Sequence, residues 1–148
     1  MNVGIVGFGS IGTEVAKALI KGVENFSLYG VASRSKSNAE KRMTKLDKHI
    51  NIYDLETLIN NCQIIIDCAP KEAFREIATK CINKERTLIT VSGSGILDNL
   101  DLEKSAKKNK SQIILATGAI LGLDALRAAS ESNINYVRMT TRKPPNAL

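Results

Sequence analysis

Apolar and polar residues alternate along this chain in blocks that predict short strands separated by amphipathic helices. Continuous apolar runs such as Ile64–Ile66 and Leu88–Ile89 are typical of parallel strands covered on both faces. We predict strands near Val3–Val6, Ser27–Ala32, Ile50–Ile52, Gln63–Cys68, Thr87–Val91 and Gln112–Ala116. We predict helices near Ser10–Lys21, Asn38–Met43, Leu55–Asn60, Lys71–Ile82 and Asp98–Asn109. This alternation predicts an α/β fold with a doubly wound parallel sheet and right-handed crossovers.

The pattern changes near the end of the chain. A short helix is expected at Leu123–Ser130 and a strand at Asn135–Thr141, and two prolines, Pro144 and Pro145, then exclude both helix and central strand. We therefore expect residues 1–120 to form one complete domain. Residues 121–148 are expected to be the beginning of a second, truncated domain.

A glycine motif joins the first predicted strand to the first helix. Gly7, Gly9 and Gly12, with Ser10 and Ile11 between the last two, give the spacing G-x-G-x-x-G of a Rossmann dinucleotide-binding turn. Gly7 permits the tight turn, Gly9 lets the backbone approach a pyrophosphate, and Gly12 lets the helix pack on the strand. The helix N-terminus would hold the phosphates. The alternative is a glycine-rich turn without a ligand.

The end of the second strand bears on the choice of cofactor. A Rossmann domain that binds NAD usually carries Asp or Glu about 20 residues after the glycines. This chain has Ser33 and Arg34 there, followed by Ser35 and Lys36, and no carboxylate. These residues favour the 2′-phosphate of NADP over the free hydroxyl of NAD. A basic loop that tolerates either cofactor is the alternative.

Ligands of such sheets lie across the carboxyl ends of the strands, and further strand ends supply candidate cofactor contacts. Small residues end the fourth predicted strand, and glycines and hydroxyls follow the fifth, where they either cradle the cofactor or form a simple turn. The sixth ends at a Gly-Ala pair close to where a nicotinamide would reach. The candidates at these ends are Cys68, Ala69, Pro70, Ser92, Gly118 and Ala119.

Other reactive residues are given structural interpretations. The single histidine, His49, lies on the adenine side of the predicted sheet and is expected on the surface. Asp67 is expected to be buried or to hydrogen-bond at its strand end, and Asp124 to lie in the first turn of a helix. Arg142 and Lys143 either meet a dicarboxylate substrate or lie in solvent. We identify no catalytic constellation and no metal site.

Composition narrows the class of protein. The chain has 148 residues, 43% hydrophobic, and a formal net charge of +6. Its basic residues are dispersed and aromatic residues make up only 4%, so we do not expect nucleic-acid binding. No apolar run approaches the roughly 20 residues of a membrane span, and no signal peptide is evident. Cys62, Cys68 and Cys81 are expected to be reduced packing thiols in a cytoplasmic protein.

A more specific resemblance lies downstream of the glycines. The stretch Thr117–Leu126, together with Thr140–Pro145, resembles the L-aspartate dehydrogenase family. Ser92-Gly93 followed by Asp98, and Cys68–Pro70, are similar to loops of the same family, and the resemblance runs over all 148 residues. It implies oxidation of L-aspartate to iminoaspartate with reduction of NAD or NADP, in the biosynthesis of NAD. It also implies that Gly118 and Ala119 contact the cofactor.

The resemblance further implies a second domain that carries a catalytic histidine and much of a dimer interface. No residue of this chain matches that histidine, and His49 does not. The chain is thus expected to bind cofactor with little or no turnover, as an isolated domain, a gene fragment or a short relative. A second copy of the chain or another partner would cover exposed core surface. The candidate residues of that surface are Leu121, Leu123 and Leu126. The alternatives are a non-catalytic NADP-binding module or subunit, and a homoserine dehydrogenase-like or dihydrodipicolinate reductase-like enzyme.

Overall fold

The computed structural model describes residues 1–46, 48–118, 122–142 and 144. The chain divides into two compact units, Met1–Ala116 and Thr117–Leu148. The first unit holds the sheet and most of the helices, and it carries the cavity described below. The second unit is considered by itself.

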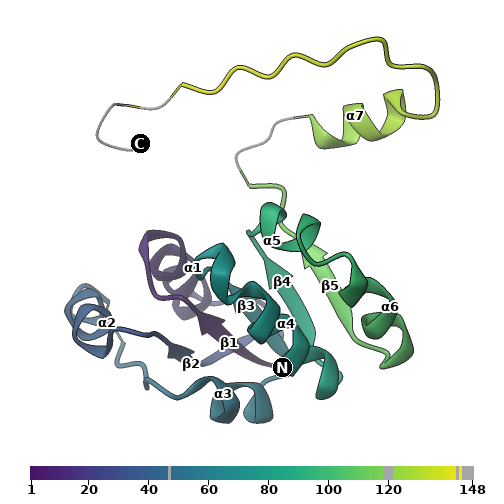
Figure 1. The fold of residues 1–148 in the computed structure, drawn as a ribbon. Coiled ribbons are helices and arrows are strands. Elements are labelled where there is room, and N and C mark those ends of the chain that lie inside the picture. The colour runs from purple at the N-terminus through teal and green to yellow at the C-terminus, as the bar shows by residue number, and fades with distance from the viewer. Residues whose placement is uncertain (47, 119–121, 143, 145–148) are drawn as a thin grey trace. The chain divides into compact units, whose positions relative to one another are not determined.

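The first unit is built on a parallel sheet in the strand order β2-β1-β3-β4-β5 (Figure 1). Its strands are β1 (Asn2–Val6), β2 (Ser27–Ala32), β3 (Ile64–Asp67), β4 (Thr87–Thr90) and β5 (Gln112–Leu115). The order reverses at β1, which pairs with β2 on one side and β3 on the other. In open α/β sheets a crevice forms at such a switch point, at the carboxyl ends of the strands.

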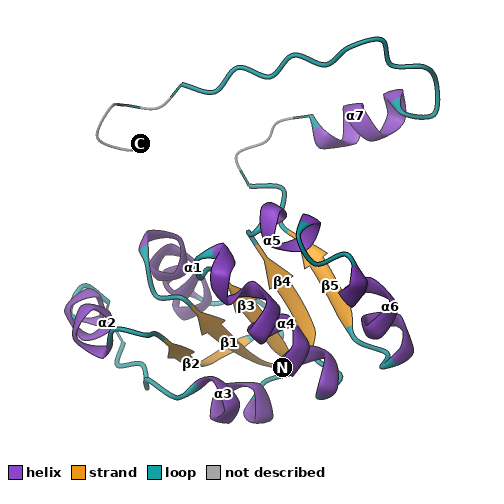
Figure 2. Ribbon diagram, viewed as in Figure 1, coloured by secondary structure: helices purple, strands orange, loops and turns teal. Residues whose placement is uncertain are grey.

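Helices cover both faces of the sheet (Figure 2). They are α1 (Ser10–Lys21), α2 (Lys36–Met43), α3 (Leu55–Asn61), α4 (Phe74–Asn83), α5 (Gly93–Leu97) and α6 (Asp101–Lys108), with a 3₁₀ turn at Lys71–Ala73 before α4. Side chains of α1 and α2 join one buried cluster, and those of α3, α4 and α6 join the other. The two clusters correspond to the two faces of a doubly wound sheet, so the predicted α/β Rossmann class is confirmed.

The apolar runs predicted part of the buried set: Ile65 and Leu88 are buried, whereas Ile64, Ile66 and Ile89 of the same runs are half-buried. Ile5, Val31, Ile65 and Leu88 are fully buried and come from four neighbouring strands. Phe74 at the start of α4 is 1% exposed and packs in the same cluster as Leu88. At the open edge of the sheet, Ile114 and Leu115 of β5 remain 45% and 41% exposed.

Three predicted elements of secondary structure differ from the structure. Ile50–Ile52 is not a strand but an isolated bridge, in which Val31 N–H donates to Asn51 O and Tyr53 N–H to Val31 O. The predicted helix Asp98–Asn109 is shortened to α6, and the separate helix α5 precedes it, because Ser92 accepts a hydrogen bond from Gly95 N–H and begins a helix there. Residues 135–141 are all described, and none of them lies in a strand.

The absence of pairing at residues 135–141 has a physical reason. A strand needs backbone partners, and a lone extended segment has none to share its N–H and C=O groups with. Also in the second unit, α7 (Leu123–Ala129) begins after Gly122 and carries Asp124 in its first turn, which confirms the place predicted for that carboxylate. Leu123 and Leu126 are half-buried, and Leu121 lies outside the described residues.

Candidate cofactor site

A cavity of about 730 Å³ lies at the carboxyl ends of β1, β2, β3 and β4. Its walls come from the glycine loop, the β2–α2 loop, the start of α3, the β3–α4 loop and the end of β4. The residues lining it are Val6, Gly7, Phe8, Gly9, Ile11, Ala32, Ser33, Arg34, Ser35, Asn38, Arg42, Tyr53, Asp54, Leu55, Cys68, Ala69, Pro70, Ala73, Glu76, Ile77 and Val91. The cavity therefore occupies the place where doubly wound sheets bind ligands.

The glycine loop is held in a conformation that requires two of its glycines. Gly7 has a φ of +88°, and a Cβ there would lie 2.5 Å from the amide nitrogen of Ala69. A Cβ on Gly12 would collide with the carbonyl oxygen of Gly7, so Gly12 brings α1 close to the loop. Gly7 N–H donates to Ala32 O, which ties the turn to the end of β2.

Gly9 differs from its two neighbours because a Cβ there would meet nothing within 4 Å. Its lack of a side chain is not needed for packing within the protein. Gly9 is the N-cap of α1 but has no side chain to accept from the first-turn N–H groups, and that turn carries no acidic residue. These N–H groups have no intrahelical partner and favour an anion. The residues present thus fit a pyrophosphate over Gly9.

One side of the cavity is basic. Ser33 and Arg34 follow the end of β2, and Ser35 caps α2 by accepting from Asn38 N–H. Asn38 and Arg42, one turn apart on α2, line the same cavity. Among the described residues, neither Arg34 nor Arg42 has a carboxylate oxygen within 4.0 Å. Within the described part of the chain, the two guanidinium groups are therefore available to an anionic ligand.

Two acidic residues, Asp54 and Glu76, also line the cavity. Asp54 caps α3: its oxygens accept from Thr57 N–H at 2.8 Å and from the Thr57 hydroxyl at 2.7 Å. These bonds, the backbone one first, hold the pKa of the Asp54 carboxyl below its usual range. The Asp54 carboxylate thus interacts with the first turn of α3, the helix that it caps.

The β3–α4 loop forms another wall of the cavity with Cys68, Ala69 and Pro70. Cys68 N–H donates to Val6 O at 2.7 Å, which fixes the loop to β1. Burial, followed by the nearby charge of Asp67, raises the pKa of the Cys68 thiol to about 11. A thiol with this pKa is protonated at neutral pH and is a poor nucleophile.

Most of the predicted cofactor contacts meet in this cavity. Gly7, Gly9, Ile11, Ser33, Arg34, Cys68, Ala69 and Pro70 line it. Ser10, Gly12 and Ser92 are not among the lining residues; Ser92 is buried, and its hydroxyl oxygen caps α5. Gly118 belongs to the second unit and has a φ of +55°, and Ala119 lies outside the described residues.

Sequence reasoning missed the contribution of α2 and of the start of α3. The separation of Asn38 from Arg42 by four residues was a usable signal, because it places both on one helix face next to Arg34. Tyr53 and Leu55 gave no comparable signal, because their approach depends on the bridge between Val31 and Ile52.

His49 and Asp67 lie as the sequence interpretation expected. His49 is exposed and lines a separate, smaller cavity with Glu40, Met43, Thr44, Leu46 and Lys48. Asp67 is 1% exposed and accepts hydrogen bonds at the end of its strand. Within the part of the chain that the structure describes, no group of three His, Cys, Asp or Glu residues could hold a metal ion.

Residues 7–116 match the family described as the NAD-binding domain of homoserine dehydrogenase. The chain belongs to this family. The match covers the glycine loop, every residue that lines the cavity except Val6, and β5, so it supports NAD or NADP as the cofactor.

Curated relatives match the chain from end to end. It is 36% identical over 148 residues to an L-aspartate dehydrogenase of Bradyrhizobium diazoefficiens, covering 100% of this chain and 52% of that protein. It is 34% identical to an L-aspartate dehydrogenase of Methanocella arvoryzae, covering 99% of this chain and 55% of that protein. The chain thus spans about half the length of the curated relatives it matches. These relatives confirm the resemblance drawn from Thr117–Leu126.

Solved structures show the same fold. A probable dehydrogenase from Thermotoga maritima superposes with a TM-score of 0.70 at 19% identity, over 88% of this chain and 41% of that one. At this identity the likeness concerns the fold alone.

No helix in the described ranges combines the length and apolar character needed to cross a membrane.

Proposed function

We propose that this chain is the cofactor-binding half of an NAD(P)-dependent L-aspartate dehydrogenase. The observation that carries the proposal is the open space over Gly9, at the N-terminus of α1 and inside the cavity at the strand ends. The end-to-end similarity to L-aspartate dehydrogenases supports the choice of substrate. The proposed domains are residues 1–120 for cofactor binding and 121–148 for the beginning of the second domain.

The roles of the residues follow from their positions. First-turn N–H groups of α1 would bind the pyrophosphate, and Cys68–Pro70 would lie along the ribose. Gly118 and Ala119 are proposed to contact the nicotinamide end, by the family resemblance. A bound nicotinamide supplies the acceptor for the hydride that L-aspartate loses on oxidation to iminoaspartate. The chain's own part is to bind and orient the cofactor.

We further propose that NADP is preferred over NAD. Arg34 and Arg42 both line the cavity, and Ser33 and Ser35 add hydroxyls at the same wall. A 2′-phosphate accepts charge-assisted hydrogen bonds from guanidinium groups, whereas the 2′-hydroxyl of NAD usually donates a hydrogen bond to a carboxylate. Of the two carboxylate residues that line the cavity, Asp54 and Glu76, Asp54 already accepts two hydrogen bonds from Thr57.

The test measures binding first and chemistry second. NADPH and NADH are titrated into the 148-residue chain, with fluorescence of the reduced nicotinamide as the readout. We expect both to bind, NADPH more tightly. The proposal is contradicted if neither NADPH nor NADH binds. Reduction of NADP⁺ by L-aspartate is then assayed with the natural gene product, with D-aspartate as the control for stereochemistry.

A homoserine dehydrogenase is the second candidate function, because the matching family takes its description from that enzyme. L-Homoserine carries an alcohol where L-aspartate carries a carboxylate, and its oxidation yields an aldehyde. Parallel assays with the two amino acids separate the candidates. Binding of NADPH with no oxidation of either substrate favours a non-catalytic NADP-binding module.

A cytoplasmic location is part of the proposal, supported by three free thiols.

A further inference from the structure

A buried chain of hydrogen bonds connects two loops at the carboxyl edge of the sheet. Asp67 ends β3 and Thr90 ends β4, and they are 1% and 0% exposed. One oxygen of Asp67 accepts from Ala69 N–H at 2.9 Å, and the other accepts from the Thr90 hydroxyl at 2.8 Å. The Thr90 oxygen in turn accepts from Ser92 N–H at 3.0 Å.

The register of the sheet brings the two side chains together. Asp67 and Thr90 are paired residues of neighbouring parallel strands, so their side chains leave the sheet on the same face. The next residues on each strand begin the β3–α4 loop and the β4–α5 loop. One carboxyl group thus supplies acceptors to both loops.

The first of these loops shapes the cavity directly. Ala69 lines it, and Gly7 lies so close that a Cβ would come within 2.5 Å of the Ala69 nitrogen. A shift of Ala69 would therefore move the turn that precedes the pyrophosphate site. Asp67 fixes Ala69 through the N–H group that would otherwise be left without this acceptor.

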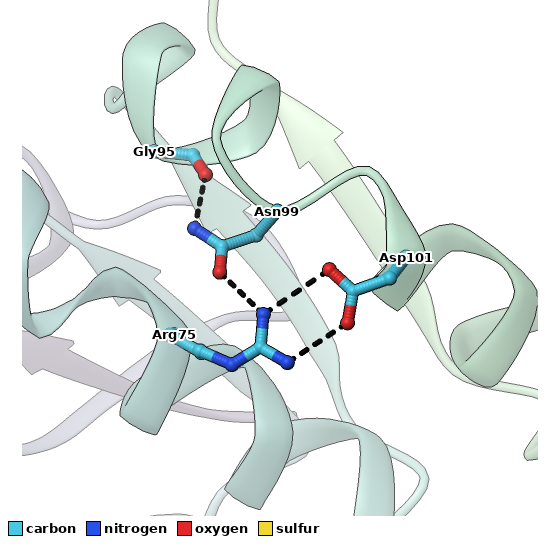
Figure 3. Close-up of polar contacts among 4 residues, drawn as sticks. All are labelled: Arg75, Gly95, Asn99 and Asp101. Atoms are coloured by element: carbon cyan, nitrogen blue, oxygen red, sulfur yellow. Dashed lines mark hydrogen bonds and ion pairs between the residues drawn. The ribbon is translucent and has the colours of Figure 1, made fainter.

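The second loop is fixed through Thr90 and continues to the surface. Ser92 caps α5, and Gly95 O accepts from the Asn99 side chain at 2.8 Å. The Asn99 oxygen accepts from Arg75, which also binds both oxygens of Asp101 (Figure 3). Val91, between Thr90 and Ser92, lines the cavity.

A carboxyl group is an unfavourable residue for this place on packing grounds alone. It follows the apolar run Ile64–Ile66, and burying it raises the pKa of Asp67, although Ala69 N–H and the Thr90 hydroxyl act in the opposite direction. An apolar side chain would extend the core, but it would leave the N–H of Ala69 and the hydroxyl of Thr90 without an acceptor.

We propose that Asp67 and Thr90 are a positioning pair for the dinucleotide: they hold the β3–α4 and β4–α5 loops at the spacing that the bound cofactor needs. The inference rests on the proposed function. Neither residue is among those that line the cavity, so both act through Ala69, Val91 and Gly7.

The experiment compares Thr90→Val, which removes the hydroxyl at nearly constant volume, with Thr90→Ser, which keeps it. Ser111→Ala is the matched control. It deletes another largely buried hydroxyl bond, from Ser111 to Arg86 O at 2.6 Å, at the amino edge of the sheet. The Kd for NADPH and the Tm are measured for each variant of the 148-residue chain, with binding measured well below every Tm.

We expect Thr90→Val to raise the Kd for NADPH roughly tenfold and Thr90→Ser to restore it to within about twofold. Ser111→Ala should lower the Tm and leave the Kd unchanged. A Kd for Thr90→Val equal to that of the wild type overturns the inference, and so does an equal rise in Ser111→Ala. If Thr90→Val does not fold, Asp67→Asn replaces it, since an amide offers one acceptor oxygen where the carboxylate offers two.

The two proposals fail in different ways. A wild-type chain that binds neither NADPH nor NADH overturns the proposed function and this inference with it. A wild-type chain that binds NADPH, with a Thr90→Val variant that binds it equally well, overturns only the positioning pair.

Discussion

Gly7 and Ala69 are in direct backbone apposition: a Cβ on Gly7 would lie 2.5 Å from the Ala69 amide nitrogen. The glycine turn after β1 is thus packed against the loop after β3. The same amide N–H donates to the Asp67 carboxylate at 2.9 Å. The pyrophosphate site is therefore supported by a neighbouring strand as well as by its own sequence.

Gly7→Ala should destabilise the fold. The residue has a φ of +88°, where an L side chain is strained, and its Cβ would overlap backbone that cannot yield as a flexible side chain would. We expect a loss of about 1–3 kcal/mol in the free energy of unfolding. Urea unfolding measures it, and an unchanged midpoint would contradict the packing described for Ala69.

Gly9→Ala should leave the fold intact and abolish dinucleotide binding. Its Cβ meets no protein atom within 4 Å, so the Tm should stay within experimental error of the wild type. The same Cβ would occupy the space required by the pyrophosphate. Titration with NADPH checks this, with Gly12→Ala as the contrast, because that variant should lower the Tm. Normal NADPH binding by Gly9→Ala would show that the glycine motif is only a turn.

Arg34→Ala and Arg42→Ala should each weaken NADPH binding and spare NADH. Each substitution removes a charge-assisted hydrogen bond to the 2′-phosphate, which is worth about 1–3 kcal/mol. The matched control is Lys41→Ala, an exposed cation of α2 that does not line the cavity. Calorimetric titration with both dinucleotides, at two salt concentrations, measures the difference. Equal losses for NADPH and NADH would reject the 2′-phosphate assignment.

Cys68 should be the first thiol to react with iodoacetamide, and only slowly. Burial raises the pKa of Cys68 to about 11 and that of Cys81 to about 12, and Cys81 is fully buried, whereas Cys68 lines the cavity. The Cys68 rate should therefore rise about tenfold per pH unit between pH 8 and pH 10, with the thiolate fraction. Saturating NADPH should slow it further. Peptide mass spectrometry follows each cysteine; labelling of Cys68 at the rate of free cysteine at pH 8 would contradict its burial.

The strands and the long helices could be predicted because their signal is local. Ser27–Ala32 is apolar in the run expected of a strand, and α1 begins and ends at Ser10 and Lys21 as its pattern indicated. Ile50 and Ile52 alternate with the polar Asn51, a pattern also expected of a strand, but the segment forms only a bridge. Strand pairing depends on how many backbone groups a neighbour presents, and a residue pattern does not carry that information.

The candidate site was predictable where a residue's role depends on its immediate neighbours in the sequence. The glycine spacing and the missing carboxylate after β2 located one wall of the cavity. Arg42 joins that wall because α2 packs into the core through Ala39, and Tyr53 joins it because the bridge between Val31 and Ile52 brings that segment to the sheet. The loop at Ser92 was expected either to cradle the cofactor or to form a turn. In the structure Ser92 caps α5, a role that depends on the helix that follows it, and its contact with the cofactor stays a prediction.

By itself, the sequence determined the fold class, the glycine turn and the family, since periodicity, glycine spacing and the stretch Thr117–Leu126 are properties of consecutive residues. The motif assigned different roles to the three glycines, and only the tertiary structure showed the space around each: a Cβ on Gly9 would meet no protein atom within 4 Å, whereas a Cβ on Gly7 or Gly12 would overlap backbone. The tertiary structure alone joined Asp67 to Thr90 across 23 residues. Space around a Cβ and bonds between strands are set by parts of the chain that are distant in sequence, and they become defined when the sheet assembles.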